Sequence, residues 1–360
     1  MPVLSYENLI SPECVLNDYI ECHVAYWFWR IVPPFLLVFG TCGNILNIII
    51  LSRHALRKYS TSMYLLFLAA SDMTNLTVSL LADAATAFRL FYIYHLNNVS
   101  CKFVEWFLYT SGLLSVWLLV MITIERFVAI KYPFTAKQYM TPKFALVSCL
   151  VLLTVSGIFT GHLLLSNQIV DVVTFNQNST HNWTVTERFC TQMPESHRLF
   201  YNGYWGLLIF LFAGVIPCII IVSGNIIIAI TVIRVRRSVL PNIQHRIVAQ
   251  NVHKTPTKLL FALTTMFLCT TMPFSIYIIN LDYTMEVNGH TLSKYQLLTV
   301  CIYCSVWCNY SFNFILYFMN GTLFKNEWKV IIQAITKSVT SAFNVAATST
   351  ATTSIRHSVP

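Results

Sequence analysis

The sequence predicts an all-α membrane protein, a seven-transmembrane helix bundle followed by a short amphipathic eighth helix. Hydrophobic residues make up 56% of the 360 residues and charged residues only 10%, a composition typical of membrane proteins. Seven stretches are long and apolar enough to cross a bilayer as helices. They cover about 31–52, 62–88, 103–130, 143–165, 203–233, 258–281 and 295–319.

These spans divide the chain into three regions. Residues 1–30 are a polar N-terminal segment without the basic start and short apolar core of a cleavable signal sequence. Residues 31–335 hold the bundle and the eighth helix. That helix places Phe324, Trp328 and Ile331 on one face, so we expect it to lie on the inner leaflet of the bilayer. Residues 336–360 are rich in Ser and Thr, and we expect this tail to be disordered.

The distribution of charge predicts the orientation of the bundle. Of the 23 Lys and Arg residues, 17 fall on the side that holds the loops after the first, third and fifth spans and the C-terminus. The positive-inside rule places that side in the cytoplasm and the N-terminus outside. We expect the protein in the plasma membrane of a cell. The net charge of +9 therefore reports topology and contact with the lipid bilayer, and indicates no nucleic-acid partner.

Acidic residues have the opposite distribution, because 11 of the 14 lie on the outer side, where only 6 basic residues stand. A negative outer face would attract a cationic ligand, although a chance distribution would look the same. Asn98, Asn178 and Asn182 begin Asn-X-Ser/Thr sequences in outer loops, so we expect glycosylation there.

The third span organises the polar groups of the bundle. It carries Glu105 near its start and the pair Glu125 and Arg126 at its end, and Cys101 stands roughly 37 Å of helix before the arginine. Charged groups at membrane depth are costly, so this pair is a functional hypothesis. Cys101 and Cys190 both lie on the oxidising side, which is compatible with a disulfide between them.

Other outer cysteines and two prolines add further expectations. Cys14 and Cys22 could pair with each other, or one of them could pair with another outer cysteine.

In the second span, the Asp72 carboxylate lies at membrane depth, so it must pair with another group, be protonated or hold an ion. Pro217 in the fifth span and Pro273 in the sixth remove backbone hydrogen bonds and would bend those helices.

Taken in order along the chain, these features resemble the rhodopsin-like (class A) G-protein-coupled receptors over about residues 31–335. The resemblance rests on Gly43-Asn44, on Leu68 to Asp72, on Cys101 with Cys190, on Glu125-Arg126-Phe127, on Pro217 and Pro273, and on Asn313 to Tyr317. It implies binding of an extracellular ligand and activation of a heterotrimeric G protein by outward movement of the sixth helix. It also implies regulation by arrestin and receptor kinases at the tail.

The resemblance further implies roles for two interior groups of residues. A polar network that could bind Na⁺, with a hydrated network without an ion as the alternative, comprises Asn44, Asp72, Ser115, Asn309 and Asn313. An activation switch comprises Glu125, which would hold Arg126 at rest, together with Val116, Pro217, Phe267, Pro273 and Tyr317. No other cofactor is implied.

Departures from the family pattern bear on the ligand. Leu108 stands where amine receptors carry an aspartate, which argues against an amine ligand, and Phe314 replaces the seventh-helix proline, which predicts a straighter helix. The chain has Asn-Phe-x-x-Tyr in the seventh span and lacks the usual tryptophan in the sixth. In these two features it most resembles invertebrate neuropeptide receptors of the FMRFamide and myosuppressin type. Asp83 and Glu105 could then pair with the arginine of an Arg-Phe-amide ligand; the alternative is that both are carboxylates at the membrane interface that face water. Leu108, Tyr109, Tyr277, Tyr303 and Trp307 would line the rest of the pocket.

Other classes of function fit the sequence less well. A lipid or another non-peptide ligand is the alternative within the receptor class. A transporter or channel would carry pseudo-repeats in its two halves, and the sequence has no such repeat. An enzyme is not expected, because Asp72 has no acid–base partner at membrane depth.

Overall fold

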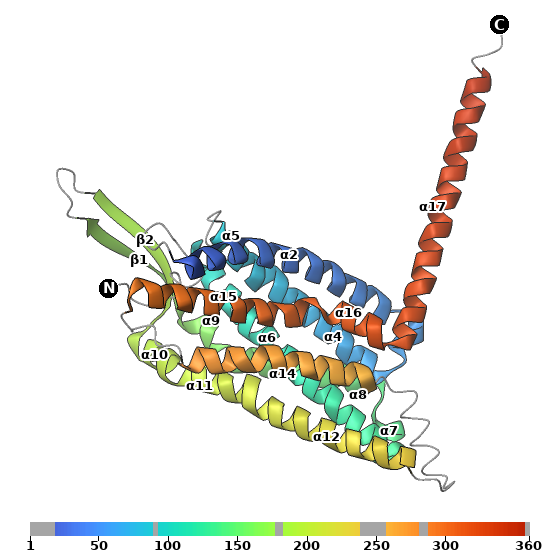
Figure 1. Ribbon diagram of the computed structural model, residues 1–360, viewed down its shortest axis with the longest axis horizontal. Helices are drawn as coiled ribbons and strands as arrows, with labels where there is room; N and C mark the ends of the chain where they lie inside the picture. Colours follow the sequence, from blue (N-terminus) through green and yellow to red (C-terminus); the bar gives the residue numbers. More distant parts are fainter. Residues whose placement is uncertain (1–18, 89–92, 177–182, 238–256, 281–286, 357–360) are drawn as a thin grey trace.

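The computed structural model describes residues 19–88, 93–176, 183–237, 257–280 and 287–356. Long helices run alongside one another, with a β-hairpin at one end of the bundle and the C-terminal helix α17 leaving it at the other (Figure 1). We call these the hairpin end and the α17 end.

The helices confirm the predicted all-α bundle. Six of them are long and apolar enough to cross a membrane, and the seventh expected span is a helix interrupted near residue 312. The seven spans are α2 (Ile20–Leu51); α4 (Ser60–Asn75) with η1 (Leu76–Leu80) and α5 (Leu81–Ala87); α6 (Asn98–Lys131); α8 (Pro142–Phe159) with α9 (His162–Ser166); η3 (Tyr201–Trp205), α11 (Gly206–Ile209), η4 (Phe210–Val215) and α12 (Ile216–Arg237); α14 (Thr257–Asn280); and α15 (Gly289–Ser311) with α16 (Asn313–Asn320). Short connecting helices are α3 (His54–Arg57), η2 (Ile93–His95), α7 (Pro133–Tyr139) and α10 (Glu195–Phe200).

The first helix is longer than the sequence predicts. It begins at Ile20 rather than near residue 31, so part of the expected polar N-terminal segment is helical. Ala25 and Trp29 in this extension are fully buried. They pack in a core at the hairpin end with Val300 and Trp307 of α15, and this burial explains the extra turns.

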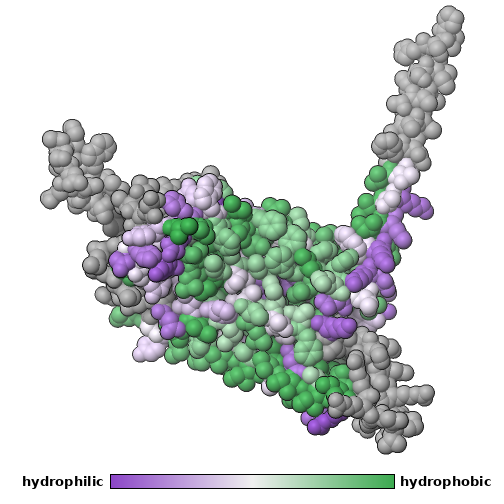
Figure 2. Space-filling view, in the orientation of Figure 1, coloured by the Kyte–Doolittle hydropathy of each residue, from purple (hydrophilic) through white to green (hydrophobic). Residues whose placement is uncertain are grey.

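The flank of the bundle is apolar, and hydrophilic side chains gather toward its two ends (Figure 2). Helix α8 exposes Val147, Val151 and Val155, which a soluble protein would bury. A hydrophobic flank of this kind suits contact with lipid. Inside the bundle, a second core at the α17 end contains Leu68, Phe267 and Tyr317.

The loop between the fourth and fifth spans forms an antiparallel hairpin of β1 (Asn167–Asn176) and β2 (Trp183–Gln192). The sequence analysis did not predict these strands. Its Val, Thr, Ile and aromatic residues are strong strand formers, and this was the signal that could have predicted it. In the hairpin, Ile169 lies opposite Cys190, whose disulfide to Cys101 ties β2 to the start of α6.

The seventh span breaks even though it has no proline at residue 314, so the expected straighter helix is wrong. Helix α15 ends at Ser311 and α16 begins at Asn313. Ser311 Oγ donates a hydrogen bond to the Leu36 carbonyl oxygen of α2 at 3.2 Å. A Cβ on Gly40 would stand 2.6 Å from that Oγ, so glycine is required for this close approach. The local contacts with α2 thus replace proline as the cause of the break.

The fifth span accommodates its proline without a break. A π-helical segment, η4, ends two residues before Pro217. A widened turn is a common way to absorb the hydrogen bond that proline cannot make.

The C-terminal helix α17 (Thr322–Arg356) continues past residue 335, through the tail that the sequence analysis expected to be disordered. Residues 322–356 contain no Gly or Pro to end a helix. Its first turns pack on the bundle, with the rings of Phe324 and Trp328 at 5.9 and 5.8 Å from that of Phe314. Arg53 Nε forms an ion pair with Glu327 Oε2 at 3.2 Å.

Candidate functional site

Two carboxylates converge at the hairpin end. Asp83 on α5 is 2% exposed, and Glu105 on α6 is half-buried. Glu105 Oε2 accepts a hydrogen bond from Asn167 Nδ2 at 2.8 Å, and Asn167 is the first residue of β1. The disulfide at Cys101, one helical turn before Glu105, holds the hairpin over the same place.

Tyr94 of the short helix η2 lies among these groups, and the sequence analysis did not single it out. Burial, together with the nearby charges of Asp83 and Glu105, raises the pKa of the Tyr94 phenol well above its usual range. Tyr109, one turn after Glu105 on α6, also lies close to it. The structure therefore brings Asp83, Glu105 and Tyr109 together around a tyrosine that a loop contributes.

Tyr109 and Tyr277, which were both expected in the pocket, each bond to a different neighbouring side chain. The hydroxyl oxygens of Tyr109 and Tyr201 lie 3.1 Å apart, and those of Tyr277 and Thr299 lie 2.5 Å apart. Leu108 is half-buried beside Tyr109.

Tyr303 and Trp307 pack in an aromatic cluster of their own. The Trp29 ring lies 6.1 Å from that of Tyr303 and 5.2 Å from that of Trp307. Trp307 is only 4% exposed, so its described contacts are those of a core residue.

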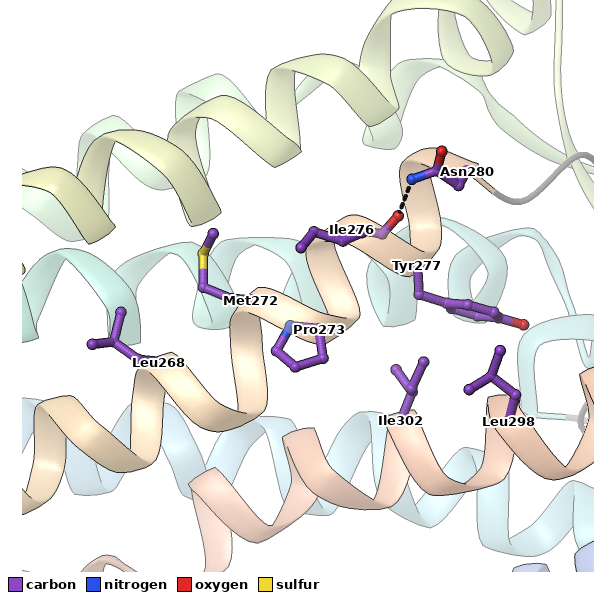
Figure 3. A pocket seen from close by; sticks show the side chains of 8 residues that line it. All are labelled: Leu268, Met272, Pro273, Ile276, Tyr277, Asn280, Leu298 and Ile302. Carbon is purple, nitrogen blue, oxygen red and sulfur yellow. Dashed lines mark hydrogen bonds between the residues drawn. The ribbon is translucent and has the colours of Figure 1, made fainter.

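A groove of about 570 Å³ lies between α14 and α15 (Figure 3). Pro273, Ile276 and Leu298 along it are exposed on the apolar flank. The Asn280 side-chain amide at its rim donates to the Ile276 carbonyl at 2.7 Å. This groove is open to the lipid-facing side and is distinct from the carboxylate site. Its lining residues are Leu268, Met272, Pro273, Ile276, Tyr277, Asn280, Leu298 and Ile302.

In mid-bundle, Asp72 is fully buried. Its Oδ1 accepts from Ser115 Oγ at 2.8 Å, and its Oδ2 accepts from Asn313 Nδ2 at 2.5 Å. Among the described residues no basic side chain is bonded to this carboxylate. A buried carboxylate with oxygen-bearing neighbours and no basic partner is a group that a small hard cation fits.

Two other members of the expected network make no hydrogen bond to Asp72 among the described residues. Asn44 Nδ2 donates to the Tyr310 carbonyl oxygen at 2.9 Å and not to the carboxylate. Asn309 lies on α15 and is 8% exposed. Only three of the five predicted members are therefore joined by hydrogen bonds.

At the α17 end, Glu125 and Arg126 do not form the direct ion pair that the sequence analysis expected. Instead, Glu125 Oε1 accepts hydrogen bonds from Ser60 Oγ at 3.0 Å and from Thr61 Oγ1 at 2.5 Å. Arg126 Nη2 donates to the same Thr61 Oγ1. The acid and the base follow one another on α6 and so point in different directions, and the hydroxyl of α4 bridges them.

Of the other predicted switch residues, Val116, Phe267 and Tyr317 belong to the core at the α17 end. Val116, Pro217 and Phe267 are buried, the first and last in one hydrophobic core. Tyr317 is 1% exposed with no hydrogen-bond partner for its hydroxyl among the described residues. Pro273 lies inside α14 and faces the flank of the bundle.

A hydrogen bond between two side chains also joins the fifth and sixth spans. Asn225 Nδ2 donates to Thr264 Oγ1 at 2.9 Å, and both residues are buried. Neither Asn225 nor Thr264 was among the predicted site residues.

The expected covalent features are placed as follows. Cys101 and Cys190 form the predicted disulfide. Cys22 is also disulfide-bonded, and Cys14 lies outside the described residues. Asn98 is exposed, with its Oδ1 accepting from the Ile169 backbone N–H at 2.7 Å, whereas Asn178 and Asn182 fall outside the described residues.

Comparison with known proteins gives one family. The family model described as 7 transmembrane receptor (rhodopsin family) matches residues 43–329, from within α2 to within α17. Neuromedin-U receptor 2 of Mus musculus is 25% identical over 308 residues, covering 84% of this chain and 74% of that receptor. Galanin receptor 2b of Danio rerio is 22% identical over 306 residues, covering 85% and 75%. C-C chemokine receptor type 1 of Homo sapiens is 28% identical over 127 residues, covering 34% and 35%.

Proposed function

Because the chain belongs to the rhodopsin family of seven-transmembrane receptors, we propose that it binds a cationic, amidated neuropeptide at the hairpin end and activates a heterotrimeric G protein at the α17 end. It is a multi-pass membrane protein and a receptor rather than an enzyme. The proposed orientation, with the N-terminus outside and the bundle in the plasma membrane, rests on the 17 basic residues of the α17 side.

The observation that carries the peptide proposal is the pair of carboxylates around Tyr94. Asp83 and Glu105 place two acids where a ligand entering from the hairpin end would arrive. A carboxylate can bind a guanidinium through two parallel hydrogen bonds, which fixes orientation as well as adding affinity. Two relatives that align along most of the chain are named as receptors for neuromedin-U and galanin, which are peptides. An Arg-Phe-amide ligand of the FMRFamide or myosuppressin type would supply both the cation and an aromatic ring.

In the proposed mechanism, the ligand's arginine pairs with Glu105 and displaces the Asn167 amide that now bonds it. The change at the start of α6 is passed along that helix to the buried core of Val116 and Phe267. Helix α14 then swings outward about Pro273, and Arg126 leaves Thr61 to contact the G protein. Arrestin and receptor kinases are further proposed partners at the C-terminal tail.

Asp72, Ser115 and Asn313 are the residues that would hold Na⁺. The ion would supply a counter-charge to the buried carboxylate and so stabilise the resting arrangement.

The test is a screen of amidated peptides, with and without a C-terminal arginine, in cells that report G-protein activation. Glu105→Gln and Asp83→Asn should each weaken an arginine-containing agonist by about tenfold or more, since a charge-assisted hydrogen bond is lost. Asp171→Asn, on the exposed face of β1, is the matched control and should leave potency unchanged. Unchanged potency in both pocket variants would remove the carboxylate site from the proposal.

A lipid ligand is the second candidate, and the apolar groove of Figure 3 is the observation that favours it. A receptor of that kind would respond to apolar compounds and lose the response when Leu298→Trp fills the groove. Its response would be insensitive to Glu105→Gln.

A further inference from the structure

Two histidines meet at the hairpin end, outside the carboxylate site. His162 is the first residue of α9 at the end of the fourth span, and His197 lies on α10 at the start of the fifth. Both side chains are half-buried, and their ring centroids are 5.3 Å apart. The Nε2 atom of each ring is shielded from solvent and has no hydrogen-bond partner among the described residues.

The contact of His162 on its other nitrogen decides which form of the ring is present. His162 Nδ1 lies 3.3 Å from the Phe159 carbonyl oxygen, which can only accept a hydrogen bond. In the neutral ring the proton must therefore be on Nδ1, which leaves a lone pair on the buried Nε2. Histidines that bind metals usually have this arrangement, with one nitrogen donating to a backbone carbonyl and the other facing the metal.

We propose that His162 and His197 together bind a divalent transition-metal ion of the zinc type through their Nε2 atoms. At the usual N–Zn distance of about 2.0–2.1 Å, a tetrahedral ion holds two imidazole centroids about 5 Å apart. The observed 5.3 Å needs little adjustment to reach that separation. Imidazole nitrogen suits zinc, copper and nickel, whereas calcium and magnesium require oxygen ligands.

Within the described part of the chain no group of three or more His, Cys, Asp or Glu side chains could hold a metal. The proposed site therefore has two protein ligands, with water completing the coordination of the ion. Such a site exchanges its metal with the outer medium and is not a permanent structural centre.

The site is joined to the proposed ligand pocket through one aromatic side chain. The Trp205 ring lies 4.3 Å from that of His162 and 5.4 Å from that of Tyr109. Drawing α9 and α10 together on a metal ion would move Trp205 against Tyr109. We therefore expect the metal to change the receptor's sensitivity to agonist, a consequence that rests on the proposed function.

Metal binding itself is tested without signalling, on the purified full-length receptor in detergent. Over a zinc titration, the unfolding temperature of the wild type should rise, because a ligand that binds only the folded state stabilises it. His162→Phe and His197→Phe should each abolish the rise while keeping the contacts between the rings of the cluster. His290→Phe is the matched control, since His290 is an exposed histidine at the same end, bonded to Glu21 at 3.2 Å, and should keep the rise.

A second measurement, which counts the nitrogen ligands directly, is used if one of the histidine variants folds poorly. Copper(II) added to the wild type should give an electron paramagnetic resonance spectrum with two nitrogen ligands, and with one in either single variant. No zinc-dependent rise in the wild type, or a rise that persists in both histidine variants, overturns the proposal. If the rise depends on both histidines but zinc leaves agonist potency unchanged, the metal site stands and the link to the ligand pocket is refuted.

Discussion

Replacing Thr61 by valine should raise signalling in the absence of ligand. The Thr61 hydroxyl donates to Glu125 and accepts from Arg126, and valine removes it while keeping the shape of the side chain. Hydrogen bonds to charged groups contribute about 1.5–3 kcal/mol each. Ser60 remains bonded to Glu125, so we count the net loss as about one such bond.

That loss bears only on the arrangement in which Arg126 is held, so it shifts the equilibrium toward the released state. A shift of about 1.5–3 kcal/mol changes the equilibrium constant by roughly 10- to 150-fold. A released state populated at about 1% would rise to somewhere between about 10% and 60%.

The assay is ligand-free nucleotide exchange on a G protein in membranes with matched receptor density. Ser60→Ala removes a bond to Glu125 without touching Arg126, so its increase should be smaller. Thr74→Val is the inert control, because Thr74 is half-buried and, among the described residues, its hydroxyl bonds only to the Ala70 carbonyl of its own helix. If Thr61→Val shows no more basal exchange than Thr74→Val, the bridge does not hold the resting state.

Three further predictions concern other parts of the bundle. Asp72→Asn should abolish any effect of Na⁺ on agonist affinity, measured by binding at equal ionic strength in sodium and in a bulky organic cation. Cys101→Ser should lower the unfolding temperature and abolish agonist binding, because the hairpin is no longer tied to α6, and Cys190→Ser should match it. Thr264→Val should increase basal exchange severalfold, since it removes the bond that joins the fifth and sixth spans through Asn225.

The long helices and the disulfide could be predicted from the sequence because they depend on properties that are local or nearly so. A span shows itself by twenty consecutive apolar residues, and the outer cysteines are restricted by topology. The hairpin was missed because the segment between the fourth and fifth spans was read for hydropathy and not for strand-forming residues, although Ile169 and its neighbours carry that signal.

Contacts between distant segments were the part that sequence reasoning could not supply. Thr61 lies 64 residues before Glu125, and no periodicity marks it as the residue that separates acid from base. Tyr94 belongs to a loop, where burial cannot be judged from the sequence. The break at residue 312 follows from Gly40 and Ser311 meeting across two helices, whereas the reasoning from Phe314 considered one helix alone.

Helix α6 carries a member of the carboxylate site, of the Asp72 network and of the Thr61 bridge, and its geometry explains how these three could act together. Glu105 at the hairpin end and Arg126 at the α17 end are separated by about 32 Å along the helix axis. Ser115, bonded to Asp72, stands eleven residues before Arg126, so at 3.6 residues per turn the two project from nearly the same face. A small rotation of α6, driven from Glu105, would therefore move Ser115 away from the buried carboxylate and Arg126 away from Thr61 in the same direction. The Ser115–Asp72 and Arg126–Thr61 contacts both join α6 to the second span, so releasing one of them strains the other. A cation bound at Asp72 would therefore resist the rotation of α6 that frees Arg126.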